Sequence, residues 1–99
     1  MAQLTAAERL TKVKIALYGT AAGTYNDEQL NFYIDTVIED LVDGGVTREV
    51  AESTAAVGCI AVGVNDLWNY TSGGVKYSAY FNRRLIQLSK KRGASDVQT

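Results

Sequence analysis

Hydrophobic residues recur every three or four positions in four segments of this chain, a spacing that predicts helices with one buried face. The first predicted helix runs from Thr5 to Gly19. Residues 5–8 read as a capping box, with threonine first and glutamate fourth, and the glycine marks the other end. Its expected apolar face is Leu10, Val13 and Leu17, and the side chains left for solvent are Glu8, Arg9, Lys12 and Lys14.

The second predicted helix runs from Asn26 to the glycine pair at 44–45. Asparagine is a favourable N-cap, and the acidic residues that follow it suit the positive end of the helix dipole. Glycine at the other end can take the left-handed conformation that closes a helix. The expected apolar stripe is Leu30, Ile34, Val37 and Leu41.

The third segment predicts one long helix from Thr47 to about Asn69, with small or apolar residues at every position from 55 to 64. A helix that is apolar all round is buried on most sides, so we expect this one at the centre of the fold. Gly58 and Gly63 each cost a helix interior about 1 kcal/mol relative to alanine. We expect the backbone of a neighbouring helix to approach closely at both glycines.

The fourth predicted helix runs from Ser78 to Lys90, with Phe81, Leu85 and Leu88 facing inward. Together the segments predict an all-α fold, a compact bundle of about four helices around a buried central third helix. Residues 1–92 are expected to form this single domain. Residues 93–99 lack periodic apolar positions and are expected to be a flexible tail.

The residue types that usually carry catalysis or hold metals are scarce. The chain has no histidine and one cysteine. Cys59 lies among small and apolar neighbours, which favours a buried side chain over a reactive thiol. No glycine-rich phosphate loop follows a strand, and no run of 18 apolar residues predicts a membrane span. We therefore expect a protein that is not an enzyme, binds no cofactor or metal, and does not enter a membrane.

Charge is sorted by segment, although the net charge is only −1. Residues 27–43 contain acidic residues and no lysine or arginine, whereas residues 76–92 contain basic residues and no aspartate or glutamate. Exposed ion pairs each add only about 0–1 kcal/mol to stability, so such sorting is better suited to orienting partners. Opposite charges on separate faces favour head-to-tail contact between identical copies, in a ring or a filament.

We accordingly predict an interface between copies of the chain. Its residues are Asp35, Glu39 and Asp43 on one copy, Arg83, Arg84, Lys90 and Lys91 on the next, and the aromatic Tyr70, Tyr77 and Tyr80. The three carboxylates lie four residues apart on one helical face. They could also hold a hard cation, but a solvated face is the stronger interpretation because no calcium-binding loop accompanies them.

The aromatic residues of the C-terminal third allow three interpretations. Trp68 and Phe81 can belong to the core, with the tyrosines at its boundary. The aromatic residues can instead anchor a protein interface, where Trp, Tyr and Arg dominate. Interleaved with basic residues, they can also stack on single-stranded nucleic acid, although a pI near 5.3 disfavours that class.

A helix-turn-helix is a further alternative for residues 44–51. The helix from Thr47 would then enter a DNA major groove and present Arg48, Glu49, Glu52 and Ser53. Two of those four side chains are acidic, and the turns that follow are apolar. A core helix after a tight turn is therefore the stronger interpretation.

The order of these segments resembles a known family. Tyr25-Asn26-Asp27-Glu28-Gln29-Leu30 opens the second helix, Asn65-Asp66-Leu67-Trp68 ends the central one, and Tyr77-Ser78-Ala79-Tyr80-Phe81 opens the last. Across roughly residues 5–90 this pattern resembles the head–tail connector (head completion or adaptor) proteins of tailed bacteriophages. The family often has proline after the serine of the last motif, where this chain has alanine.

The resemblance implies a helical subunit that joins about a dozen copies in a ring. The ring would sit in the virion beneath the portal protein, extend the DNA channel and receive the next connector or tail protein. Genomic DNA would pass through without sequence-specific binding, and the subunit would be made in the host cytoplasm. A tail-completion protein at the same joint remains an alternative, as does the helix-turn-helix regulator.

Overall fold

The computed structural model of this chain describes residues 3–19, 27–68 and 77–91, and all of its regular elements in these ranges are helical. The elements are α1 (Ala6–Tyr18), α2 (Asp27–Asp43), α3 (Arg48–Ala51), the 3-10 turn η1 (Thr54–Ala56), α4 (Val57–Trp68) and α5 (Ala79–Ser89). The predicted all-α class is therefore confirmed. The predicted tail at 93–99 lies outside the described residues.

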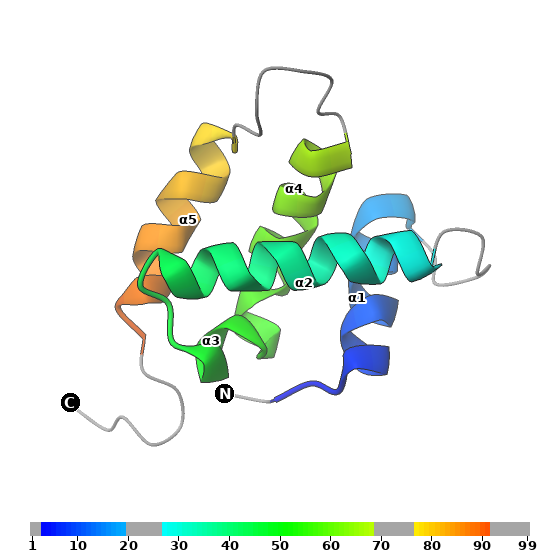
Figure 1. Ribbon diagram of the computed structural model, residues 1–99, viewed down its shortest axis with the longest axis horizontal. Helices are drawn as coiled ribbons and strands as arrows, with labels where there is room; N and C mark the ends of the chain where they lie inside the picture. The colour runs from blue at the N-terminus through cyan, green and yellow to red at the C-terminus, as the bar shows by residue number, and fades with distance from the viewer. Residues whose placement is uncertain (1–2, 20–26, 69–76, 92–99) are drawn as a thin grey trace.

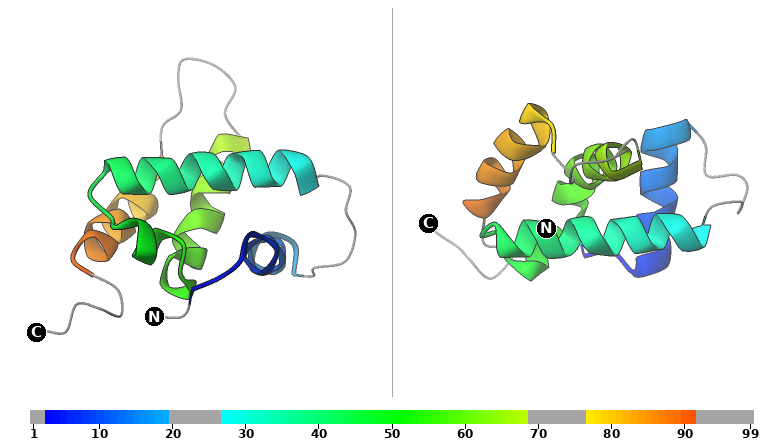
Figure 2. Two further views of the ribbon diagram at one scale, coloured as in Figure 1. Left: turned by 60° about the horizontal axis from the view of Figure 1, so that its bottom comes forward. Right: turned by 45° about the horizontal axis from the view of Figure 1, so that its top comes forward.

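The helices form two layers (Figures 1 and 2). In Figure 1, α5, α4 and α1 run beside one another, and α2 crosses in front of all three. The left view of Figure 2 shows α2 as a separate layer above the others. Helix α4 packs against α1, α2 and α5, and Ile60 and Val64 on it are fully buried. The apolar segment is therefore the central helix of the fold, as predicted.

Most helix ends lie where the sequence predicts them. The Thr5 hydroxyl accepts a hydrogen bond from the Glu8 N–H (3.1 Å), and the Glu8 carboxylate accepts one from the Thr5 N–H (2.9 Å), which completes the capping box. Gly19 and Gly45 have φ angles of 79° and 108°, so these two turns use the left-handed conformation that glycine adopts without a steric cost. The Ser78 hydroxyl caps α5 by accepting the Phe81 N–H (3.3 Å).

The prediction of one continuous helix from Thr47 to about Asn69 is wrong. Helix α3 ends at Ala51, and the chain turns at the fully buried Ser53 before η1 begins. The Ser53 hydroxyl donates to the Val50 carbonyl (2.8 Å) and accepts the Ala55 N–H (3.2 Å). A serine side chain that bonds its neighbouring backbone in this way competes with helix continuation and caps the next turn. Apolar periodicity alone does not reveal such a break.

Two charged side chains expected in solvent are buried instead. Arg9 is 7% exposed, and its guanidinium donates to the carbonyls of Leu4 (2.9 Å) and Glu52 (3.3 Å). Lys14 is 6% exposed and forms an ion pair with Asp27 (2.8 Å) that joins α1 to α2. Long basic side chains can cover apolar surface while their charged ends reach acceptors, so a polar residue type does not by itself place a side chain in water.

The two glycines of α4 have different surroundings. A Cβ atom on Gly63 would lie 2.7 Å from Cε2 of Phe81 and 2.9 Å from Cγ1 of Val37. Side chains from α5 and α2 therefore meet α4 at this position, rather than a neighbouring backbone. A Cβ atom on Gly58 would have nothing within 4 Å, so the expected close approach at Gly58 is wrong.

We predict opposite effects of alanine at these two glycines. Gly63→Ala should lower the free energy of unfolding by about 1–3 kcal/mol, because Phe81 and Val37 must move to admit the methyl group. Gly58→Ala is the matched control and should raise stability by up to about 1 kcal/mol, because alanine favours the helix. Urea unfolding followed by circular dichroism measures both. Equal effects at the two positions would contradict the packing described at Gly63.

Candidate functional site

The outer face of α2 carries a row of exposed acidic residues, which we call the acidic stripe. Its members are Glu28, Asp35, Glu39 and Asp43. Phe32 lies within the row and is 67% exposed. The opposite face of α2 packs into the core through the predicted Leu30, Ile34, Val37 and Leu41, together with Ile38. The three carboxylates predicted at the interface therefore do share an exposed helical face.

One member of the acidic stripe already has a partner within the chain. Glu39 forms an ion pair with Arg48 at 2.7 Å, and Arg48 also pairs with Glu52 at 3.3 Å. The hydrogen bond to Glu39 is the main reason why the pKa of Arg48 is raised. Asp35 and Asp43 have no ion pair within the described residues. Both carboxylates are exposed, whereas Glu39 would have to share its charge between Arg48 and any further partner.

The outer face of α5 carries Arg83, and Lys90 is the residue that caps the C-terminal end of this helix; we call these two residues the basic stripe. Both side chains are exposed, and Ile86 between them is 56% exposed. Arg84 points instead toward its own chain, where it donates to the Ala55 carbonyl (3.3 Å) and the Gln87 side chain (2.9 Å). Lys91 is partly buried. Of the four predicted basic interface residues, Arg83 and Lys90 are thus the most accessible.

The acidic and basic stripes lie on different parts of the molecule. The acidic stripe is on α2, which forms a layer of its own, and the basic stripe is on α5, at one end of the row of three helices behind it (Figure 1). The ion pairs of the described residues join Lys14 to Asp27 and Arg48 to Glu39 and Glu52. None of these pairs brings the two stripes together.

The aromatic residues predicted at the interface divide between packing and exposure. The Tyr77 ring stacks on Phe81 with centroids 4.0 Å apart, and its hydroxyl donates to the Asp40 carboxylate at 2.5 Å. Burial, followed by the hydrogen bond to Asp40, raises the pKa of Tyr77. Tyr80 is 50% exposed, and Tyr70 lies outside the described residues.

The two residues that lead into α5, Tyr77 and Ser78, are held by carboxylates from two other helices. Asp40 of α2 accepts the Tyr77 hydroxyl, and Asp66 of α4 accepts the Ser78 N–H at 3.0 Å. These bonds fix the start of α5 relative to both α2 and α4. The sequence motifs around Asp66 and Ser78, which are far apart along the chain, therefore form one local structure.

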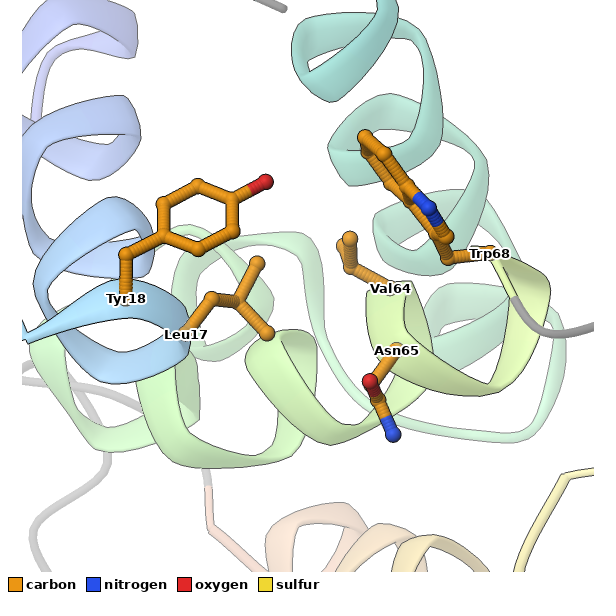
Figure 3. A pocket seen from close by; sticks show the side chains of 5 residues that line it. All are labelled: Leu17, Tyr18, Val64, Asn65 and Trp68. Atoms are coloured by element: carbon orange, nitrogen blue, oxygen red, sulfur yellow. The ribbon is translucent and has the colours of Figure 1, made fainter. Parts of the chain in front are cut away.

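A shallow apolar pocket between α1 and α4 was not predicted. Its volume is about 240 Å³, and its lining is Leu17, Tyr18, Val64, Asn65 and Trp68. Figure 3 shows the rings of Tyr18 and Trp68 extending from their two helices on either side of Val64. Trp68 is 40% exposed and contacts Tyr33 edge to face, so the interpretation that places it in the core is wrong, whereas Phe81 is buried. The pocket forms because α1 packs beside α4. Hydrophobic periodicity does not predict which helices are neighbours, so the pocket could not be predicted from the sequence.

The described residues offer little reactive chemistry. Cys59 is buried, its thiol lies 3.9 Å from the Phe81 carbonyl oxygen, and burial raises the pKa of Cys59 to about 11. A thiol that stays protonated at neutral pH is a poor nucleophile. No group of three or more Cys, His, Asp or Glu side chains in the described ranges is arranged to hold a metal ion.

The segment considered as a helix-turn-helix has a different geometry. Helix α3 spans four residues, and Val50 and Ala51 on it are buried. Arg48, its basic side chain, is engaged by Glu39 and Glu52. The helix that follows is the buried α4. This arrangement does not favour insertion into a DNA groove, which needs an exposed helix with free polar side chains.

Comparison with protein-family models, curated proteins and solved structures finds no match. In the described ranges, every helix is too short or too polar to cross a lipid bilayer.

We predict that Tyr77→Phe lowers the free energy of unfolding by about 1 kcal/mol, because it removes the hydrogen bond to Asp40 while keeping the ring on Phe81. Tyr80→Phe is the matched control and should leave stability unchanged, because the Tyr80 hydroxyl makes no hydrogen bond to any of the described residues. Urea unfolding of the three proteins measures the difference. A Tyr77→Phe variant as stable as the wild type would show that the bond to Asp40 does not hold α5.

We also predict that stability falls at alkaline pH through Cys59. Burial raises the pKa of Cys59 from the ordinary thiol value of 9.0 to about 11, so the folded state keeps the thiol protonated. That contribution is complete below pH 9 and is lost as the pH rises to about 11. The urea midpoint measured from pH 8 to pH 11 should therefore fall less steeply for Cys59→Ala than for the wild type. Identical slopes would contradict the role of the thiol.

Proposed function

We propose that this chain is a structural subunit of the head–tail joint of a tailed bacteriophage, and that it assembles with copies of itself into a ring beneath the portal protein. The observation that carries the proposal is the separation of exposed opposite charges. The acidic stripe lies on α2 and the basic stripe on α5, and the ion pairs of the described residues do not join them. Separate complementary faces suit a head-to-tail assembly of identical subunits.

The local structure at the start of α5 supports the same proposal. Two of the motifs that carry the resemblance to head–tail connectors, one around Asp66 and one around Ser78, meet through the hydrogen bond between these residues. The two motifs therefore share one structural task, which is to set the direction of α5. In a ring subunit, that direction orients the basic stripe toward the next copy.

In this role the chain works by assembly rather than by catalysis. The ring would continue the DNA channel of the portal, bind the next connector or tail protein on its other side, and let genomic DNA pass without sequence-specific contact. A tail-completion protein at the same joint would use the same charged faces. The helix-turn-helix alternative draws no support from α3, which is only four residues long, or from Arg48, which is already in an ion pair.

We predict that deletion of this gene from the phage or prophage that carries it leaves DNA-filled heads and separate tails. The physical reason is that the surface joining the two would be missing. Electron microscopy of lysates scores the particles, and supplying the gene in trans is the control that should restore infectious phage. Normal tailed particles after deletion would contradict the proposed function. Full heads without tails would distinguish a joint protein from a DNA-binding regulator, whose loss changes transcription.

A further inference from the structure

The two most exposed large hydrophobic side chains of the described residues lie within opposite charged stripes. Phe32 on α2 is 67% exposed, and Ile86 on α5 is 56% exposed. Single exposed apolar residues are common on protein surfaces. Here each is flanked on its own helical face by residues of one charge, and the charge on α2 is opposite to that on α5.

The charged residues around Phe32 and those around Ile86 have the same spacing when the two helices are counted in opposite directions. On α2, Glu28 is followed by Phe32 after four residues and by Asp35 after three more. Counted backwards from Lys90, the C-cap residue of α5, Ile86 comes after four residues and Arg83 after three more. Residues at these spacings share one helical face. The steps correspond to about 6 Å and about 4.5 Å along each helix axis.

We infer that copies of this chain contact one another by antiparallel packing of α2 of one copy against α5 of the next. Phe32 then lies against Ile86, with Glu28 beside Lys90 at one side and Asp35 beside Arg83 at the other. This inference rests on the proposed function, because it names the contact by which the ring subunits join. The partner of the charged faces is a second copy of the chain.

The structure also explains why these four charges form the contact rather than their neighbours. Glu39 is already bound by Arg48, and Arg84 is already bound to the Ala55 carbonyl. Glu28, Asp35, Arg83 and Lys90 are all exposed, and none has an ion pair in the described part of the chain. The antiparallel direction also places Lys90, near the C-terminus of α5, beside the first turn of α2, where Glu28 lies.

The contact is heterologous, because it joins two different surfaces of identical copies. Each copy then uses α2 toward one neighbour and α5 toward the other. One pair of short helices buries less than the roughly 1,200–2,000 Å² of a standard stable interface. Two copies are therefore expected to bind weakly, and closure of a ring stabilises the assembly because every copy then makes two contacts.

The experiment reverses the charges on each helix and then on both. One variant, Glu28→Lys/Asp35→Lys, reverses the charges on α2, and the other, Arg83→Glu/Lys90→Glu, reverses the basic stripe. Sedimentation velocity and native mass spectrometry of the full chain should show that each variant assembles at least tenfold more weakly than the wild type. The variant with all four substitutions, and an equimolar mixture of the two reversal variants, should recover assembly because opposite charges face one another again. Circular dichroism checks that each variant keeps its helices.

Controls separate this contact from a general effect of charge. Lys12→Glu, on α1, reverses an exposed charge outside both stripes and should assemble like the wild type. Phe32→Ala should weaken assembly, because it removes the apolar side chain at the centre of the contact. It should not lower the helix content, because the Phe32 phenyl group is exposed in a single copy. Assembly unaffected by either reversal, or no recovery in both the fourfold variant and the mixture, would overturn the contact. A wild type that stays monomeric at millimolar concentration would overturn it as well.

A cross-linking experiment tests the register directly. All copies carry Cys59→Ala. When Phe32→Cys and Ile86→Cys copies are mixed and oxidised, they should form more mixed disulfide dimer than either of them forms with Ile15→Cys, a control on α1. An equal yield from the Ile15→Cys control would overturn the proposed register. These results are independent of the particle phenotype after gene deletion. If deletion separates heads from tails while the charge reversals have no effect, the proposed function stands and this contact is wrong.

Discussion

The packing of α4 between α1, α2 and α5 is the constraint on which the rest of the structure depends. This helix is apolar on most sides, so it is stable in water only when neighbouring helices cover it. At Gly63 the neighbouring helices come close, because Phe81 from α5 and Val37 from α2 occupy the space a side chain would fill. With α2 and α5 held against one helix, their outer faces are also held in place. The charged surfaces are therefore a consequence of how the core is covered.

Much of this fold follows from local signals in the sequence. The capping box at Thr5, the glycine pair after α2 and the cap at Ser78 each act within one turn of the chain, so they can be read without knowing the fold. The break at Ser53 is different, because nothing in the apolar spacing distinguishes a serine that caps a new turn from one inside a helix. Burial of Arg9 and Lys14 likewise depends on carbonyls and a carboxylate contributed by other segments.

The candidate site shows the same division between local and long-range information. The positions of Asp35, Arg83 and Lys90 on exposed helical faces follow from periodicity and charge. Periodicity and charge do not show which of these side chains already have partners within the chain. Arg48 approaches Glu39 from the next helix, and Arg84 reaches a carbonyl 29 positions earlier. The exposure of Trp68 beside the pocket depends on how α1 meets α4. Sequence reasoning therefore predicts the two faces but not the few residues on each that remain available.

The attachment of α5 has a geometric consequence for any assembly of this chain. The residues just before its first turn, Tyr77 and Ser78, are bound to Asp40 on one helix and Asp66 on another, and Leu88 in its last turn is buried. A helix held at both ends cannot easily change its direction. A second copy packed along α5 would therefore have a fixed angle relative to α2. In a circle of identical units that angle is repeated at every step, and its size sets the number of units that complete 360°. In the proposed ring, the curvature would then depend on the two hydrogen bonds that hold the start of α5 in each subunit.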